Sequence, residues 1–163
     1  MMRGLLKRIL PTALGSMMLT ACDSVDCTLN NIVACNYAFY NHEGKAVELT
    51  GVLTVSAMGT DSVLFNQGRN ISTLSLPMSY WAQADTLVFD LEGEDYSISQ
   101  SFVVHKTNTE HFESPDCPIN MFHEITNVDL LRHGVIDSVV VVKNSVNFDT
   151  NENIRIYLHT DNE

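Results

Sequence analysis

Histidines and carboxylates in the second half of the chain are candidates for metal binding or acid–base chemistry. His105, His111 and His123 accompany Glu110 and Glu113. Structural zinc needs a tighter ligand pattern than the spacing of these histidines gives. Histidines on the surface explain the pattern better, so we expect no metal and no cofactor.

A second candidate for metal binding begins at Asp149, where Asp149-x-Asn151-x-Asn153 starts like a calcium loop. Such a loop needs glycine at its sixth position and a bidentate glutamate at its twelfth. Ile154 and Thr160 stand at these positions instead. We therefore interpret the segment as a polar turn before a strand.

Recognisable catalytic motifs are missing from the sequence. Glu92, Glu94 and Asp95 are close together, but their glycine-containing segment is typical of a solvated turn. The chain has no Gly-x-Ser-x-Gly, no His-Glu-x-x-His and no phosphate-binding loop. We therefore expect a protein that is not an enzyme.

Cys22 gives the most specific chemical signal, because it directly follows Leu19-Thr20-Ala21. Basic residues precede an apolar run over residues 9–21, which is typical of a secretory signal and too short to span a bilayer as a helix. The Leu-x-Ala-Cys pattern is similar to the lipobox of bacterial lipoproteins, in which the cysteine sulfur takes a lipid and the signal is cut before it. The sequence thus predicts a lipoprotein signal peptide over residues 1–21 and a lipidated tether over residues 22–33. The membrane would be one of the cell envelope, with the protein facing the periplasm or the cell surface.

Composition limits the partners of the mature chain. Three of the nine basic residues precede Cys22 and all twenty acidic residues follow it, so the formal charge after the cut is −14. Such a surface repels phosphate backbones, and we expect no nucleic acid partner. The lipid must supply the membrane attachment, since acyl chains contribute about 0.8 kcal/mol per buried methylene.

Three cysteines follow Cys22, and an odd number leaves one thiol over. Cys27 and Cys117 lie in irregular segments, which gain most from a covalent tie, whereas Cys35 opens an apolar run and can pack as a small hydrophobic side chain. We predict a disulfide between Cys27 and Cys117. Pairing of Cys35 with either of the other two stays open, because connectivity does not follow from sequence.

Apolar residues alternate with polar residues from Cys35 onward, which predicts seven to nine β-strands and no helix. In the last strand, Ile154, Ile156 and Leu158 share one face, while Arg155 and Tyr157 share the other. Further expectations concern where strands break and which way they face. Gly51 marks a bulge or a close approach of two backbone segments. Residues 67–70 form a turn, and residues 105–118 are the longest irregular stretch. The Tyr96 side chain faces the core, and residues 138–142 form a central strand.

Short strands separated by regular turn signals are typical of all-β domains with two packed sheets. We therefore predict a single domain over residues 34–160 with an antiparallel two-sheet sandwich of immunoglobulin-like type. A small barrel is the alternative.

Seven short segments are spread over nearly the whole mature chain. They are Asp26-Cys27, Phe39-Tyr40, Leu76-Pro77, Asp85-Thr86-Leu87, Asp116-Cys117, Ile136-Asp137-Ser138-Val139 and Asn153-Ile154-Arg155-Ile156-Tyr157. Together they resemble an uncharacterised family of small lipoproteins of Bacteroidota, although Pro118 replaces the glycine expected in that family and Cys35 is an addition. The resemblance implies an envelope lipoprotein without a known activity.

The pattern Asp-Ser/Thr-aliphatic occurs four times and is similar to the O-glycosylation acceptor motif of Bacteroidota envelope proteins. The hydroxyl residues are Ser24, Ser62, Thr86 and Ser138. A glycan there would bulk and solubilise the surface. The alternative is that each motif merely leads from a turn into a strand.

These observations favour a lipid-anchored envelope protein that binds or scaffolds other envelope components and has no chemistry of its own. An exposed apolar patch would support this hypothesis. A lipoprotein that binds a small ligand or a metal is the alternative, and a pocket that gathers His105, His111 or His123 with Glu113 would support it. An enzyme would need a concave site with buried titratable groups.

Overall fold

The computed structural model describes residues 32–159, while residues 1–31 and 160–163 lie outside this description. The predicted signal peptide, Cys22 and most of the predicted tether fall in the first of these two segments. In the part of the chain that is described, no helix is long and apolar enough to cross a membrane.

Residues 32–159 form ten β-strands and no helix. The strands are β1 (Cys35–Asn41), β2 (Leu49–Ala57), β3 (Val63–Ile71), β4 (Thr73–Leu76), β5 (Ala84–Glu92), β6 (Ser97–His111), β7 (Asn120–Leu130), β8 (Ile136–Val141), β9 (Ser145–Val146) and β10 (Ile154–Leu158). They are arranged as two open sheets, in the orders β4-β1-β10-β8 and β3-β2-β5-β6-β7-β9. The predicted all-β class with two sheets is confirmed.

Strand pairing brings the first and last strands of the domain together. β1 and β10 pair in parallel, with Tyr37 opposite Ile154 and Phe39 opposite Ile156. The other ladders between the described strands are antiparallel. The four-stranded sheet therefore joins segments from the two ends of the domain sequence.

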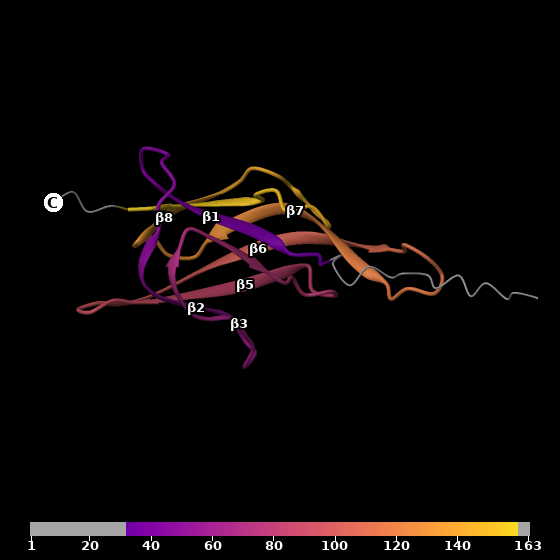
Figure 1. Cartoon of the computed structure of the whole chain (residues 1–163), viewed down its shortest axis with the longest axis horizontal. Helices are drawn as coiled ribbons and strands as arrows, with labels where there is room; N and C mark the ends of the chain where they lie inside the picture. Colours follow the sequence, from indigo (N-terminus) through magenta and orange to yellow (C-terminus); the bar gives the residue numbers. More distant parts are fainter. Residues whose placement is uncertain (1–31, 160–163) are drawn as a thin grey trace, which may run out of the picture.

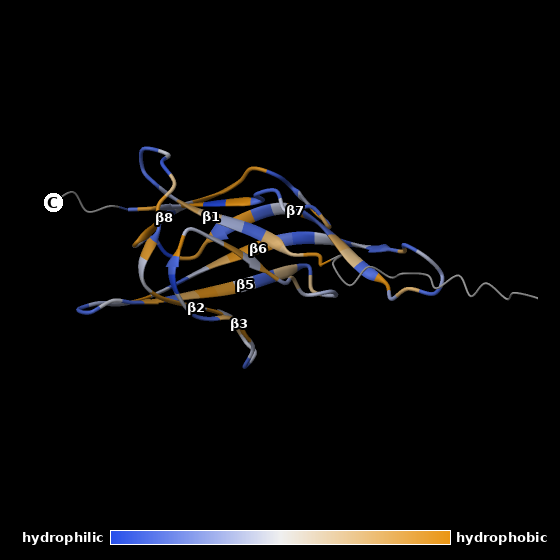
Figure 2. Ribbon diagram, in the orientation of Figure 1, coloured by the Kyte–Doolittle hydropathy of each residue, from blue (hydrophilic) through white to orange (hydrophobic). Residues whose placement is uncertain are grey.

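The two sheets share one core. Tyr37 and Phe39 of β1 meet Phe89 of β5, with ring centroids 6.5 Å apart in both pairs. Phe102 of β6 stacks on Phe89 at 5.1 Å, and all four side chains are buried. Apolar positions alternate with polar ones along the strands (Figure 2). The burial of apolar and aromatic surface in such a cluster supplies most of the stability of a small domain.

Two detailed expectations are confirmed. In β10, Ile154 and Ile156 are fully buried, whereas Arg155 between them is partly exposed. In β2, Gly51 lies close to another backbone segment, since a Cβ there would come within 2.7 Å of the Glu92 carbonyl oxygen. The alternation of apolar residues and the isolated glycine were therefore sufficient signals at these positions.

β6 is longer than the sequence predicts. Residues 105–111 continue the strand, and the irregular segment is confined to residues 112–119. The buried side chain in this part of β6 is Lys106, which is 2% exposed, so the apolar alternation stops although the backbone stays extended. A register shift between His105 and Lys106 marks this point.

Three other expectations are wrong. Residues 67–70 belong to β3, because positive φ angles of 50° at Gln67 and 55° at Asn70 let the strand bulge and resume its pairing with β2. β8 is an edge strand rather than a central one, and the outward side chain of Val140 is 43% exposed. Tyr96 lies in the β5–β6 turn and is 42% exposed, because the alternation begins only with β6.

The domain has two distinct ends along its long axis (Figure 1). At one end β1 begins at Cys35, which pairs with Leu76 at the end of β4, and the β6–β7 turn protrudes. We call this the entry end, and it also carries the loop over residues 77–83. The β5–β6 turn over residues 93–96 lies at the opposite end, which we call the far end.

Candidate functional site

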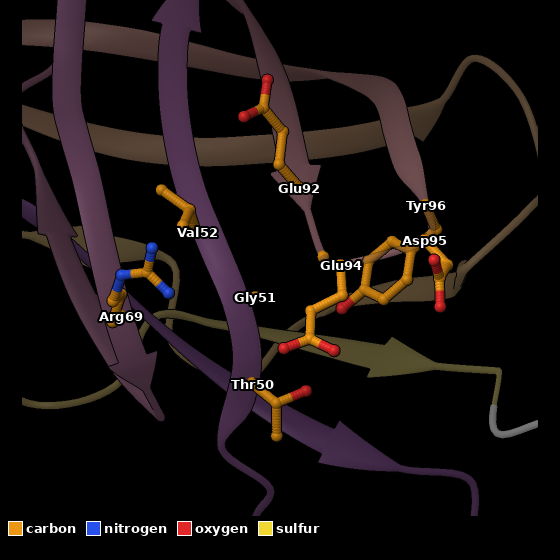
Figure 3. A pocket seen from close by; sticks show the side chains of 9 residues that line it. Thr50, Gly51, Val52, Arg69, Glu92, Glu94, Asp95 and Tyr96 are labelled. Atoms are coloured by element: carbon orange, nitrogen blue, oxygen red, sulfur yellow. The ribbon is translucent and has the colours of Figure 1, made fainter.

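An open groove of about 700 Å³ lies at the far end, on the six-stranded sheet (Figure 3). Thr50, Gly51 and Val52 of β2 line it together with Arg69 of β3. The last residue of β5 and the β5–β6 turn, residues 92–96, complete the lining. The groove is therefore built by three neighbouring strands and one turn.

Two glycines let the β5–β6 turn fold back on β2. The Tyr96 ring lies against Gly93, where a Cβ would come within 2.1 Å of its Cε1 atom. The Tyr96 hydroxyl oxygen would lie 3.0 Å from a Cβ at Gly51. The Gly93 N–H donates to the Tyr96 carbonyl at 2.8 Å and closes the turn. Glycine at both positions thus places Tyr96 at the groove, where a larger residue would displace it.

Charged side chains of both signs line the groove. Figure 3 shows Arg69 on one side of β2, and Glu92, Glu94 and Asp95 on the side of the turn. None of the four belongs to an ion pair formed within residues 32–159. The three carboxylates are exposed, so the predicted solvated acidic turn is confirmed. Unpaired charges on a concave surface can engage the polar groups of a partner.

A second exposed feature lies at the entry end. The loop over residues 77–83, which we call the Trp81 loop, joins β4 to β5 and exposes Tyr80 (49%) and Trp81 (78%). A hollow of about 400 Å³ is lined by this loop, the β2–β3 turn and the start of β5. The loop therefore presents two aromatic rings beside a concave surface.

A buried lysine holds the base of the Trp81 loop. Lys106 Nζ donates to the carbonyls of Ser79 (2.6 Å) and Ala82 (2.7 Å), which flank the two aromatic residues. It also donates to Asn108 Oδ1 at 2.9 Å and lies 3.6 Å from the Asp85 carboxylate. Burial lowers the pKa of Lys106, and the charge of Asp85 opposes that shift. Sequence reasoning missed this cluster because a lysine in a polar segment is ordinarily exposed.

His123 of β7 extends the same polar cluster. Its side chain is buried, and Nδ1 lies 2.8 Å from Asn108 Oδ1. Burial, and after it the charge of Lys106, lower the pKa of His123 from 6.5 to about 4, although Asp85 acts in the opposite sense. The imidazole is therefore neutral at pH 7 in the folded protein.

The lowered pKa of His123 predicts a loss of stability in mild acid. Between pH 6.5 and about 4, His123 is protonated in the unfolded chain but neutral in the folded protein. The free energy of unfolding therefore decreases as the pH is lowered through this range. His123→Gln should flatten this part of the profile. Denaturant unfolding at a series of pH values measures the effect, and His105→Gln is the matched control on an exposed histidine. Identical profiles for wild type and His123→Gln would contradict the prediction.

The other candidate metal ligands do not meet at one place. His105 Nε2 lies 2.8 Å from Asp129 on an exposed strand surface, and His111 stacks on Phe122 with ring centroids 4.1 Å apart. Glu113 lies in the β6–β7 turn. Residues 32–159 contain no group of three or more side chains placed to hold a metal. The group of ligands that would have favoured a metal-binding function is therefore not assembled within residues 32–159.

The segment over residues 149–153 ties β10 to its neighbours. Asp149 pairs with Lys143, and this contact lowers the pKa of the Asp149 carboxyl. The Asn153 side chain is buried and donates to the carbonyls of Lys143 (3.2 Å) and Ser145 (2.9 Å). Asn153 Oδ1 accepts the Asn36 N–H at 3.0 Å. These polar side chains thus connect β1 and the segment before β9 to the start of β10.

The predicted glycan acceptors occupy different surroundings. Ser62 is exposed in the β2–β3 turn, whereas Thr86 in β5 and Ser138 in β8 are partly buried. Ser62 and Thr86 line the same hollow beside the Trp81 loop. Ser24 lies outside the described residues. The structure thus brings two of the four motifs together and separates a third from them.

The cysteines also differ from one another. Cys35 is a buried free thiol, and burial raises its pKa to about 12. Both alternative pairings that use Cys35 therefore disagree with the structure. Cys117 is not a free thiol. Cys22 and Cys27 lie outside the described residues.

The fold and the two exposed features define a small all-β domain with a polar groove at one end and an aromatic loop toward the other. The chain belongs to the DUF6452 family, a family of unknown function whose model matches residues 52–158. Five of the seven segments that carried the resemblance lie within this range, and the predicted relationship to an uncharacterised family is confirmed to that extent. Searches of curated proteins and of solved structures found no match to the chain.

Proposed function

We propose that the protein is a lipid-anchored module of the cell envelope that binds or scaffolds other envelope components through the groove at the far end. The observation that carries this proposal is that the groove and the start of β1 lie at opposite ends of the domain. A lipid on Cys22 would keep the entry end near the membrane, because the ten residues from Asp23 to Ile32 span at most ~35 Å. The groove would then face away from the membrane.

The chemistry of the groove favours a protein partner over a small ligand. Small-ligand sites usually enclose most of their ligand in a largely apolar cavity, whereas this groove is open and polar. Arg69 on one side and the carboxylates on the other suit a segment that carries charges of both signs. A small polar ligand in the same groove is the alternative. The proposal includes no catalytic step.

The finer architecture is also a proposal. Two sheets around one shared core support a sandwich of immunoglobulin-like type, and the predicted antiparallel pairing is corrected at β1 and β10, which pair in parallel. The sheets would hold the groove at a fixed distance from the entry end.

Site-specific photo-crosslinking in the native host tests the proposed function. A photo-reactive residue replaces Thr50 in the groove, or Val140 on the outer face of the other sheet as a matched control. We expect one reproducible crosslinked partner at Thr50 only, and its loss in Arg69→Glu. Equal products at both positions, or none at Thr50, would reject the groove as the binding site.

Labelling with palmitate tests the proposed anchor separately. Cys22→Ala should abolish incorporation of labelled palmitate, and continued labelling would refute the anchor.

We propose Ser62 as a glycan acceptor, because it is the exposed member of the three described motifs. Ser62→Ala should lower the intact mass of the protein from its native host by the mass of a glycan, whereas Ser138→Ala should change it only by the loss of one oxygen. Thr86→Ala and Ser24→Ala complete the series. A wild-type mass equal to peptide plus lipid would exclude glycosylation altogether.

We also propose the disulfide between Cys27 and Cys117. The free thiol of Cys35 supports it, because both alternatives require that residue. A bond over a loop of about 90 residues is worth about 4–5 kcal/mol in the chain-entropy model. Non-reducing peptide mapping should recover the two cysteines in one linked peptide, and recovery of Cys27 as a free thiol would contradict the pairing.

A further inference from the structure

Large apolar side chains are exposed in both loops of the entry end. Trp81 and Tyr80 are 78% and 49% exposed in the Trp81 loop. Phe112 and Ile119 are 57% and 45% exposed in the β6–β7 turn. Exposed aromatic and aliphatic residues that gather in one region of a small domain mark a contact surface.

The Trp81 loop presents its rings on a fixed backbone. Lys106 holds the carbonyls of Ser79 and Ala82, and Asn108 Nδ2 donates to the Ala82 carbonyl at 3.0 Å. The Asp85 carboxylate accepts the Ser79 N–H at 3.2 Å. Both sides of the Tyr80-Trp81 pair are thus tied to β5 and β6. A surface ordered in advance loses less conformational freedom when it binds.

The place of this surface in the chain indicates what it touches. Leu76, which directly precedes the Trp81 loop, pairs with Cys35 at the start of β1. The chain from Cys22 therefore reaches the domain beside this loop, and the thirteen residues from Asp23 to Cys35 span at most ~45 Å. The proposed bond from Cys27 to Cys117 would bring the β6–β7 turn still closer, within five residues of the anchor. The surface thus lies at the end of the domain where the tether from Cys22 would arrive.

The chemistry of the loop matches a bilayer surface. Residues 77–83 carry no charged side chain, in a mature chain whose formal charge is −14. Tryptophan and tyrosine are enriched at membrane–water interfaces, where their amphipathic rings lie at headgroup level. We infer that the entry end rests on the bilayer that carries the lipid anchor, with Trp81 in the interfacial region. This inference rests on the proposed lipidation of Cys22.

Trp81 is the only tryptophan in the sequence, so its fluorescence reports on this surface alone. The mature lipidated protein from its native host is reconstituted into phosphatidylcholine vesicles, with or without bromine on the acyl chains. We expect brominated vesicles to quench Trp81 emission. The triple variant Tyr80→Ser, Phe112→Ser and Ile119→Ser should lose this quenching and shift the emission to longer wavelength.

A matched control moves the reporter away from the entry end. In Trp81→Phe with Leu131→Trp, the tryptophan occupies the β7–β8 turn at a site that is 54% exposed, and no lipid quenching is expected. Vesicle-bound protein whose Trp81 stays unquenched would overturn the inference and leave the anchor intact. Protein that does not float with vesicles would refute the anchor and this inference together. Shielding of Trp81 in native membranes but not in protein-free vesicles would assign the surface to a protein partner and overturn membrane contact.

Discussion

Lys106→Ala should lower the free energy of unfolding by about 3–5 kcal/mol, the usual cost of removing one member of a buried charge pair. The lysine side chain is fully buried, and Asp85, 3.6 Å from its Nζ atom, would lose its cationic partner. The carbonyls of Ser79 and Ala82 would lose a charged donor as well. Urea unfolding followed by circular dichroism measures the change.

A second lysine provides the control for this result. Lys143→Ala removes a partly exposed pair with Asp149 and should cost no more than about 1 kcal/mol. Lys106→Met keeps most of the apolar stem, so it separates the loss of charge from the loss of packing. Fluorescence anisotropy of Trp81 should fall in both Lys106 variants, because the loop loses its anchor. Wild-type stability together with unchanged anisotropy would show that the ammonium group does not hold the loop.

Ile156→Ala should cost about 2–5 kcal/mol, the range for deleting a large aliphatic side chain from a core. Ile156 is fully buried in β10, opposite Phe39 in the parallel ladder and Val139 on the other side. A cavity here would lie between the two central strands of the four-stranded sheet and the aromatic core. Thermal unfolding of the variant gives the magnitude.

The neighbouring residue tests the register of the strand. Arg155 points to the outer face, where it pairs with Glu152 and its guanidinium lies 4.8 Å from the centre of the Tyr40 ring. Arg155→Ala should therefore change the melting temperature far less than Ile156→Ala. Equal melting temperatures for the two variants would reject the assigned register.

The parts of the fold that followed a simple alternation were predictable, and the parts organised by polar burial were not. The order of apolar and polar residues in β10 was enough to assign its two faces. In β6 the inward position is occupied by Lys106, whose burial depends on acceptors more than twenty residues away in sequence. No local pattern contains that information. In β8 the apolar residues on both faces suggested a central strand, yet apolar residues also occur on exposed faces.

Only part of the candidate site could be predicted from the sequence. The acidic turn and the unusual position of Gly51 were evident, and each is explained by the structure. The sequence did not show that Arg69 and Gly51 line the same groove. That depends on the pairing of β2 with β3, whose register shifts three times along the ladder. The Trp81 loop was missed for a similar reason, since nothing in residues 77–83 shows which groups hold its backbone.

The parallel pairing of β1 with β10 constrains when the protein can fold. β10 lies between β1 and β8, so the four-stranded sheet stays in two halves until the last residues of the domain have left the ribosome. Contacts between such distant segments form late and slow the folding of β-proteins. For the export that we propose, this delay would keep the chain unfolded while it is threaded through a translocation channel. The final strand would then complete the domain when the chain leaves the translocation channel.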